Sequence, residues 1–149
     1  MHLGVRSTVL GFFFLGVVVG CGGYEAPQPQ ERVETYPVTG IVKVDGQPVE
    51  KIAVRLHPVG GQQGKALPTA SGFTDKDGKF SIGTYESGGG APAGEYVLTF
   101  QWGQLNLMTN QYGGDKFKGK YLDPKKSQFK VKVEPGKPTD VGVIELSTK

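Results

Sequence analysis

From Tyr36 to the carboxyl terminus the chain repeatedly alternates apolar and polar residues with a period of two, and no stretch sustains a helical period. Successive side chains of a β-strand point to opposite faces, so this alternation is typical of strands that bury one face. The signal occurs over residues 38–44, 52–56, 69–74, 80–85, 94–102, 129–134 and 141–146. The 24 glycines and 10 prolines suit short strands joined by turns. The sequence therefore predicts an all-β fold, a seven-stranded antiparallel sandwich.

Two connections between these segments carry hairpin signals. Asp45-Gly46 follows the first segment, and Asp75-Lys76-Asp77-Gly78 separates the third from the fourth. Gly46 and Gly78 are expected at positive φ, which tight turns require. In the last segment the alternation changes parity between Val143 and Ile144, which predicts a β-bulge or a strand buried on both faces.

Residues 1–20 have the layout of a secretory signal, with Arg6 ahead of the uncharged run Thr8–Gly20. A helix needs about 20 apolar residues to span a bilayer, so this run is too short for a comfortable membrane span. It ends in Val18-Val19-Gly20-Cys21, which resembles the lipobox of bacterial lipoproteins. The resemblance implies cleavage after Gly20, acylation of Cys21 (palmitate is typical), and anchoring to the cell membrane or outer membrane, facing the periplasm or the surface. The membrane lipid on Cys21 is thus the first expected partner.

Residues 21–35 are predicted to form a flexible tether, because they show no apolar period and contain Pro27 and Pro29. A flexible coil of this length spans about 20 Å on average, which would hold the folded part just off the lipid surface. The folded domain is then expected over residues 36–149. It contains no cysteine, so it must be stable without a disulfide.

Several stretches of the folded part resemble the carboxypeptidase regulatory-like domain family: TYPVTGIVKVDGQPVEKIAVRLHPVG, GFTDKDGKFSIGTY and APAGEYVLTF. The later stretch KGKYLDPKKSQFKVKVEPGK is similar to the tails of small lipoproteins of planctomycete type. The resemblance implies a transthyretin-like (prealbumin-like) Greek-key sandwich. It also implies an accessory, adhesive or structural module, because the matching motifs specify the fold and carry no catalytic residues.

Residues 103–126 show little strand signal, and a connection of this length is uncommon unless it is functional or packs on its own domain. Both alternatives stay open, because the segment's aromatic residues suit either role. If the segment binds a partner, an envelope protein or a polysaccharide, the residues expected to contact it are Tyr112, Lys116, Phe117, Lys118 and Tyr121. The lysines of the chain are interleaved with acidic residues at a net charge of +3, so nucleic acid is not an expected partner.

The remaining chemistry-bearing residues point to no metal, cofactor or catalytic set. Asp75 and Asp77 lack the further oxygen ligands of a calcium loop, so a hairpin turn is expected there. His57 is the only histidine after the signal segment, which excludes a zinc site built from several histidines. A sugar-stacking platform of Trp102, Tyr112 and Tyr121 is an alternative to their burial, although Trp102 shares a strand face with core residues.

The sequence therefore predicts a non-enzymatic, membrane-anchored lipoprotein that displays a β-sandwich binding or structural module in the cell envelope. The alternatives are a carbohydrate-binding module and, third, a degenerate transthyretin-like hydrolase that would depend on His57.

Overall fold

The computed structural model describes residues 32–60, 67–106, 108–109 and 111–149. The expected signal peptide (1–20), the lipidation site Cys21 and the tether as far as residue 31 lie outside the described residues. Residues Arg32–Lys149 form one compact unit. In the part of the chain that the structure describes, no helix is long and apolar enough to cross a membrane.

All regular elements in the described ranges are strands, so the prediction of an all-β fold is confirmed. The strands are β1 (Thr35–Tyr36), β2 (Val38–Val44), β3 (Gln47–Pro48), β4 (Ile52–Pro58), β5 (Ala70–Phe73), β6 (Lys79–Ser81), β7 (Ala91–Pro92), β8 (Gly94–Trp102), β9 (Gln104–Asn106), β10 (Gln111–Gly113), β11 (Lys130–Val133) and β12 (Thr139–Leu146). Each of the seven expected segments overlaps one of them. The other five strands, β1, β3, β7, β9 and β10, have two or three residues each and were not anticipated.

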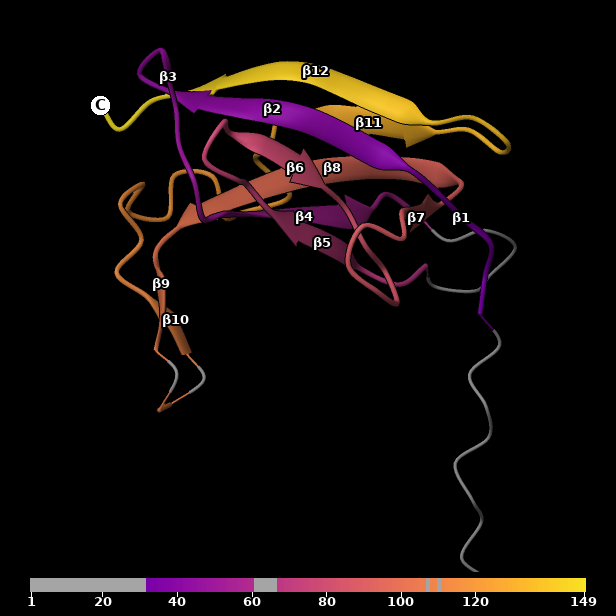
Figure 1. Ribbon diagram of the computed structural model, residues 1–149, viewed down its shortest axis with the longest axis horizontal. Coiled ribbons are helices and arrows are strands. Elements are labelled where there is room, and N and C mark those ends of the chain that lie inside the picture. The colour runs from indigo at the N-terminus through magenta and orange to yellow at the C-terminus, as the bar shows by residue number, and fades with distance from the viewer. Residues whose placement is uncertain (1–31, 61–66, 107, 110) are drawn as a thin grey trace, which may run out of the picture. The chain divides into compact units, whose positions relative to one another are not determined.

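Two four-stranded sheets face one another across the core (Figure 1). The first has the order β11-β8-β4-β5, with antiparallel pairing throughout. The second has the order β12-β2-β3, and β6 also pairs with β2, beside β3. Its β12 runs parallel to β2, so the expectation of a wholly antiparallel sandwich is wrong at this pair. Parallel neighbours need a long crossover, and the rest of the domain supplies it, because β2 begins the sandwich and β12 ends it.

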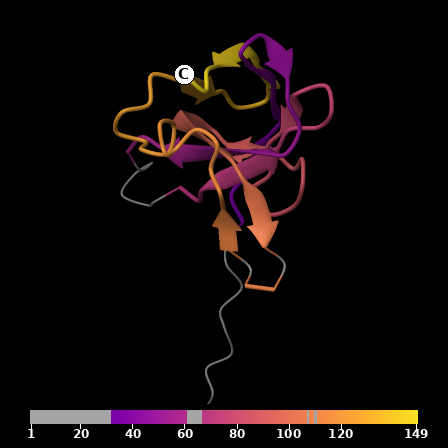
Figure 2. The same ribbon diagram turned by 90° about the vertical axis from the view of Figure 1, so that its left-hand side faces the viewer.

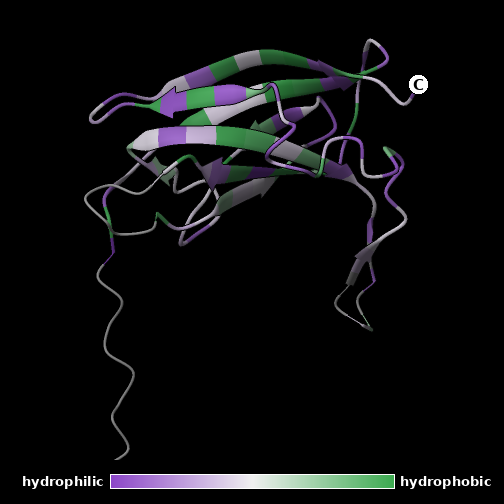
Figure 3. Ribbon diagram, turned by 180° about the vertical axis from the view of Figure 1, so that it is seen from behind, coloured by the Kyte–Doolittle hydropathy of each residue, from purple (hydrophilic) through white to green (hydrophobic). Residues whose placement is uncertain are grey.

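The core lies between the sheets and follows the period-two pattern. In β2, Val38, Val42 and Val44 are buried, whereas Thr39 is exposed between them. Residues Leu98 and Phe100 of β8 face the same core, and Figure 3 shows hydrophobic and hydrophilic residues alternating along the strands. In β2 alternate side chains therefore sort between core and outer face as expected, whereas in β8 the outward residues Val97 and Thr99 are buried too.

The expected turns and the expected bulge are confirmed. Asp45 and Gly46 have φ angles of 50° and 83°, the pair of left-handed conformations that a two-residue hairpin turn needs, and Gly78 has a φ of 72°. The register between β12 and β2 shifts between Asp140 and Val143, where Gly142 has a φ of 76°. This bulge is the reason that the apolar parity changes along β12.

Candidate functional site

The segment 103–126, expected to contain little strand, begins with a β-hairpin. Strands β9 and β10 pair in antiparallel register and project away from the two sheets (Figures 1 and 2). At its tip the Asn106 side-chain oxygen accepts hydrogen bonds from the backbone N–H groups of Met108 and Thr109, at 2.9 and 3.3 Å. The Met108 side chain is 96% exposed. After the hairpin, residues 116–126 fold back as a series of turns against the sandwich.

Two of the expected partner-contacting residues pack on the domain, which is the second alternative for this segment: Phe117 lies in the core and Tyr121 packs against it. Phe117 is buried, at 3% exposure, and its ring lies edge-on to Tyr121 with centroids 5.1 Å apart. Tyr121 is half-buried, packs against Phe100 and Phe129, and its hydroxyl accepts a hydrogen bond from the Ser147 amide. The Phe117 ring is closed off from solvent in this arrangement, so it offers no exposed surface to a partner. The turns of residues 116–126 therefore cover part of the core, because the rings of Phe117 and Tyr121 pack against its other residues.

The other three expected contact residues stay at the surface. Lys116 and Lys118 are exposed, and the Lys116 ammonium lies 4.0 Å from the centre of the Trp102 ring. Tyr112 is half-buried: its hydroxyl donates to the Lys51 carbonyl at 2.8 Å and its ring lies 6.3 Å from that of Phe73. Trp102 is half-buried and lies against Phe117, not against Tyr112. The structure therefore does not bring Trp102, Tyr112 and Tyr121 together as one sugar platform.

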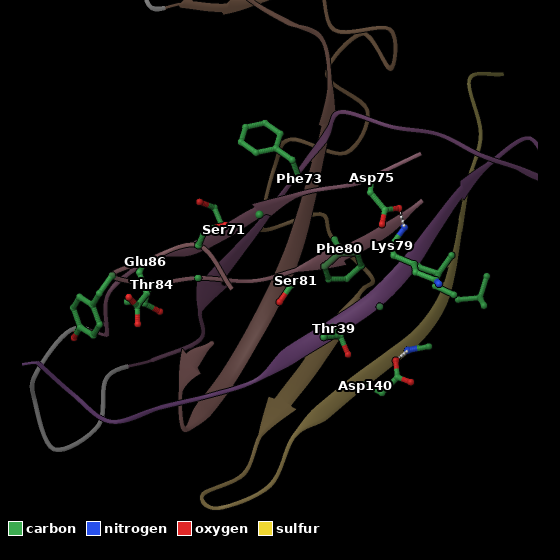
Figure 4. Close-up of a pocket in the computed structure, with 18 residues that line it drawn as sticks. Thr39, Ser71, Phe73, Asp75, Lys79, Phe80, Ser81, Thr84, Glu86 and Asp140 are labelled. Carbon is green, nitrogen blue, oxygen red and sulfur yellow. Dashed lines mark hydrogen bonds between the residues drawn. The ribbon is translucent and has the colours of Figure 1, made fainter. Parts of the chain in front are cut away.

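A groove of about 950 Å³ lies along β5, β6, β2 and β12, and residues 103–126 do not line it (Figure 4). We call it the edge groove. It exists because β5 belongs to one sheet and β6 to the other, and the 74–78 hairpin crosses between them. Ser71 of β5 forms a bridge with Gly83, which follows β6, through two backbone hydrogen bonds of 3.0 and 2.9 Å. Residues from both sheets consequently share one concave surface.

The edge groove combines exposed apolar side chains with hydroxyl groups. Its most exposed apolar residues are Phe73 (58%), Val143 (55%) and Tyr85 (38%). Its hydroxyl-bearing residues are Thr39, Ser71, Ser81, Thr84, Tyr85 and Ser87. A concave surface with apolar contacts and a few polar groups is the usual form of a ligand site, so this groove is the candidate functional site.

Charged groups of the edge groove are mainly acidic. Asp75, Glu86 and Asp140 line it together with a single cation, Lys79. The Asp75 carboxylate accepts hydrogen bonds from the backbone N–H groups of Asp77 and Lys79, both at 2.9 Å, and Asp140 accepts one from Gly142 at 2.9 Å. Each of these two carboxylates therefore keeps one oxygen for another donor. Within the described residues no three His, Cys, Asp or Glu side chains are grouped so that they could hold a metal ion.

His57 lies apart from the residues that line the groove. Its Nε2 is 2.9 Å from the Thr99 hydroxyl, and burial, with a smaller contribution from the Arg55 charge, lowers the pKa of His57 below 6.5. Thr99 is 2% exposed although it is on the outward parity of β8. Asp75, considered above as a calcium ligand with Asp77, caps its own hairpin turn.

Sequence reasoning missed the edge groove almost entirely. The available signal was the parity of β5, where Phe73 occupies an outward position in a segment whose inward positions are Ala70, Gly72 and Thr74. An aromatic ring on a polar face is informative only when the neighbouring surface is known, since single exposed apolar residues are common.

Comparison with known proteins adds no family. No protein-family model matches the chain, and no curated protein matches it. Among solved structures, a 9R-lipoxygenase from Cyanothece PCC8801 is similar with a TM-score of 0.38 and 16% identity, over 80% of this chain and 18% of the lipoxygenase. A likeness at this level carries no argument about function.

Proposed function

We propose that the protein is a lipid-anchored, non-enzymatic binding module of the bacterial cell envelope and that the edge groove is its ligand surface. The single observation that carries the binding role is the groove itself, which leaves Phe73 58% exposed beside several hydroxyl groups. Apolar area that folding leaves in contact with water costs about 25 cal/mol per Å², so a ligand gains free energy by covering it. The lipobox-like sequence ending in Cys21 supports the anchor.

We also propose that the sandwich is transthyretin-like, as its resemblance to carboxypeptidase regulatory-like domains implies. The matched motifs occupy structurally demanding places: Asp45-Gly46 forms the turn after β2, and Gly78 ends the turn before β6. Gly94 begins β8, where a Cβ atom would lie 2.8 Å from Leu67 Cδ1. These positions explain why such motifs indicate a fold and leave activity unspecified.

The anchor is tested by the mass of the amino-terminal fragment from membranes. We expect an acylated fragment that begins at Cys21, because the lipobox resemblance places cleavage after Gly20. An intact Met1 or an unmodified Cys21 would contradict the anchoring proposal. A Cys21→Ala variant should leave the membrane fraction.

The binding role is tested by photo-crosslinking in native membranes. A photoreactive residue at Ser81, an exposed position in the groove, should capture an envelope component. The matched control carries the same group at Lys132, an exposed position of β11 that does not line the groove. Equal capture from both positions, or none from Ser81, would contradict the assignment of the groove.

The protruding β9–β10 hairpin supports a second contact surface, for a protein partner. Met108 at its tip is 96% exposed, and Tyr112, Lys116 and Lys118 follow it on the surface. A deletion of residues 106–120 is unsuitable as a test, because it would also remove Phe117 from the core. A Met108→Ser variant keeps the fold and should weaken capture only if the hairpin makes the contact.

A further inference from the structure

We infer that the edge groove takes a neutral oligosaccharide. This inference rests on the proposed binding role of the groove and names the class of ligand. A sugar ring presents an apolar C–H face and a rim of hydroxyl groups, so a site for it needs an aromatic surface flanked by hydrogen-bonding groups.

The aromatic surface is the ring of Phe73. It is 58% exposed on the free side of β5 and is supported by the tilted ring of Tyr112 at a centroid distance of 6.3 Å. This support limits the orientations that the Phe73 ring can adopt, and a preorganised ring loses less entropy when a ligand covers it. Figure 4 shows Phe73 at the rim of the groove, above the strand that carries Ser81.

Hydrogen-bonding groups lie on the same concave surface. Thr39, Ser71 and Ser81 line the groove and are exposed, so a ligand in the groove can reach their hydroxyl groups. Asp75 and Asp140 each add a carboxylate oxygen beyond the one engaged in a turn. Hydroxyl groups that donate and accept, together with carboxylates that accept, match the vicinal diols of a sugar.

The charge of the groove disfavours acidic polymers. Three carboxylates against one ammonium make this surface locally negative, although the whole chain has a net charge of +3. An anionic glycan would meet like charges near Asp75, Glu86 and Asp140, which opposes binding. The volume of about 950 Å³ stands at the upper end of the range for ligand pockets, so an open chain of several sugar rings fits better than a monosaccharide.

A peptide is the competing occupant. A peptide strand would add to the free edge of a sheet through backbone hydrogen bonds. Along β5, however, Ser71 already uses its backbone N–H and C=O on Gly83, which leaves little edge for such a strand. The groove therefore favours a ligand that is recognised by side chains.

The test is calorimetric titration of the full chain in detergent with three neutral hexasaccharides, cellohexaose, mannohexaose and chitohexaose, and with the anionic hexagalacturonate. We expect saturable binding of at least one neutral hexasaccharide and binding of hexagalacturonate weaker by about tenfold or more. Phe73→Ala should weaken the neutral ligand by about tenfold, and Thr39→Val by about threefold. Val59→Ala removes an apolar side chain of similar exposure (53%) outside the groove and should leave the affinity unchanged.

Each result decides the inference. Absence of binding by every neutral hexasaccharide at concentrations on the order of 10 mM, or equal binding by wild type and both groove variants, would overturn it. If a protein is nevertheless crosslinked from Ser81 and not from Lys132, the groove binds a peptide: the glycan inference fails and the proposed binding role stands. If the groove variants do not change glycan binding and Ser81 captures no more than Lys132, the oligosaccharide inference and the proposed binding role both fail. Unfolding midpoints of Phe73→Ala and Thr39→Val that match wild type show that lost affinity is not lost structure.

Discussion

Replacing Phe117 by alanine is expected to destabilise the domain severely, because in its segment, for which binding and packing were both open alternatives, this residue packs in the core. The Phe117 ring is 3% exposed, lies edge-on to Tyr121 at 5.1 Å and is tilted against Trp102 at 5.8 Å. Alanine would leave a cavity that these two rings can fill only by moving from their other contacts.

The magnitude follows from the lost burial. A buried phenylalanine removes roughly 200 Å² of apolar area from water, which corresponds to about 5 kcal/mol at 25 cal/mol per Å². The alanine side chain still buries part of this area, which lowers the cost, whereas the cavity that is left raises it. The expected loss in the free energy of unfolding is about 3–5 kcal/mol. Small domains have a total stability of about 5–15 kcal/mol, so the variant would lose a large part of it.

The assay is urea unfolding followed by tryptophan fluorescence, since Trp102 contacts the mutated ring. Met108→Ala is the matched control: Met108 is in the same segment but 96% exposed, and its loss should change the free energy of unfolding by less than about 0.5 kcal/mol. A loss below about 1 kcal/mol for Phe117→Ala would refute the claim that these turns complete the core, and would restore Phe117 as a surface residue.

Three further predictions use the same unfolding assay. The buried Thr74 hydroxyl accepts a hydrogen bond from the Ile52 amide at 2.9 Å, so Thr74→Val should cost about 1–3 kcal/mol and Thr74→Ser much less; equal losses would contradict a role for the hydroxyl. Because burial holds the pKa of His57 below its ordinary value of 6.5, the unfolded chain binds a proton at a higher pH than the folded domain does, and stability should fall as the pH drops through 6.5. His57→Gln should remove that part of the pH dependence, and an unchanged profile would show that His57 does not cause it. At Gly72 an added Cβ would overlap the Ser81 carbonyl oxygen, so Gly72→Ala should cost more than about 1 kcal/mol, and a neutral effect would show that β5 and β6 are not in close approach.

The faces of the main strands were predictable from the sequence, because side-chain parity is a local property of an extended backbone. The alternation in β2 and β4 identified Val38, Val42, Ile52 and Leu56 as inward residues, and all four are fully buried. Turn chemistry was equally local: Asp45-Gly46 has few alternatives to the conformation it adopts.

The aromatic residues of 103–126 show where local reasoning ends. Tyr112, Phe117 and Tyr121 look alike in the sequence, since none follows a clear strand alternation. Phe117 is in the core, Tyr121 packs at the margin of the core, and Tyr112 packs against Phe73 at the surface. Which of these roles a ring takes depends on the surface it meets when the chain folds back, and the sequence near it does not encode that surface.

The all-β class, the core-facing positions of the main strands and the tight turns were predictable from the sequence, because each depends on neighbouring residues and on the period of the backbone. For the last strand the sequence left a bulge or burial on both faces open, and the register shift in the structure shows the bulge. The parallel pairing of β12 with β2 and the groove that Phe73, Ser81 and Asp140 share became visible only when the sheets packed. Asp140 is far from Phe73 and Ser81 along the chain, and the three share one groove because β5 and β6 belong to different sheets. A site made at the junction of two sheets has no local signature, since its parts are ordinary strand residues until the sheets pack.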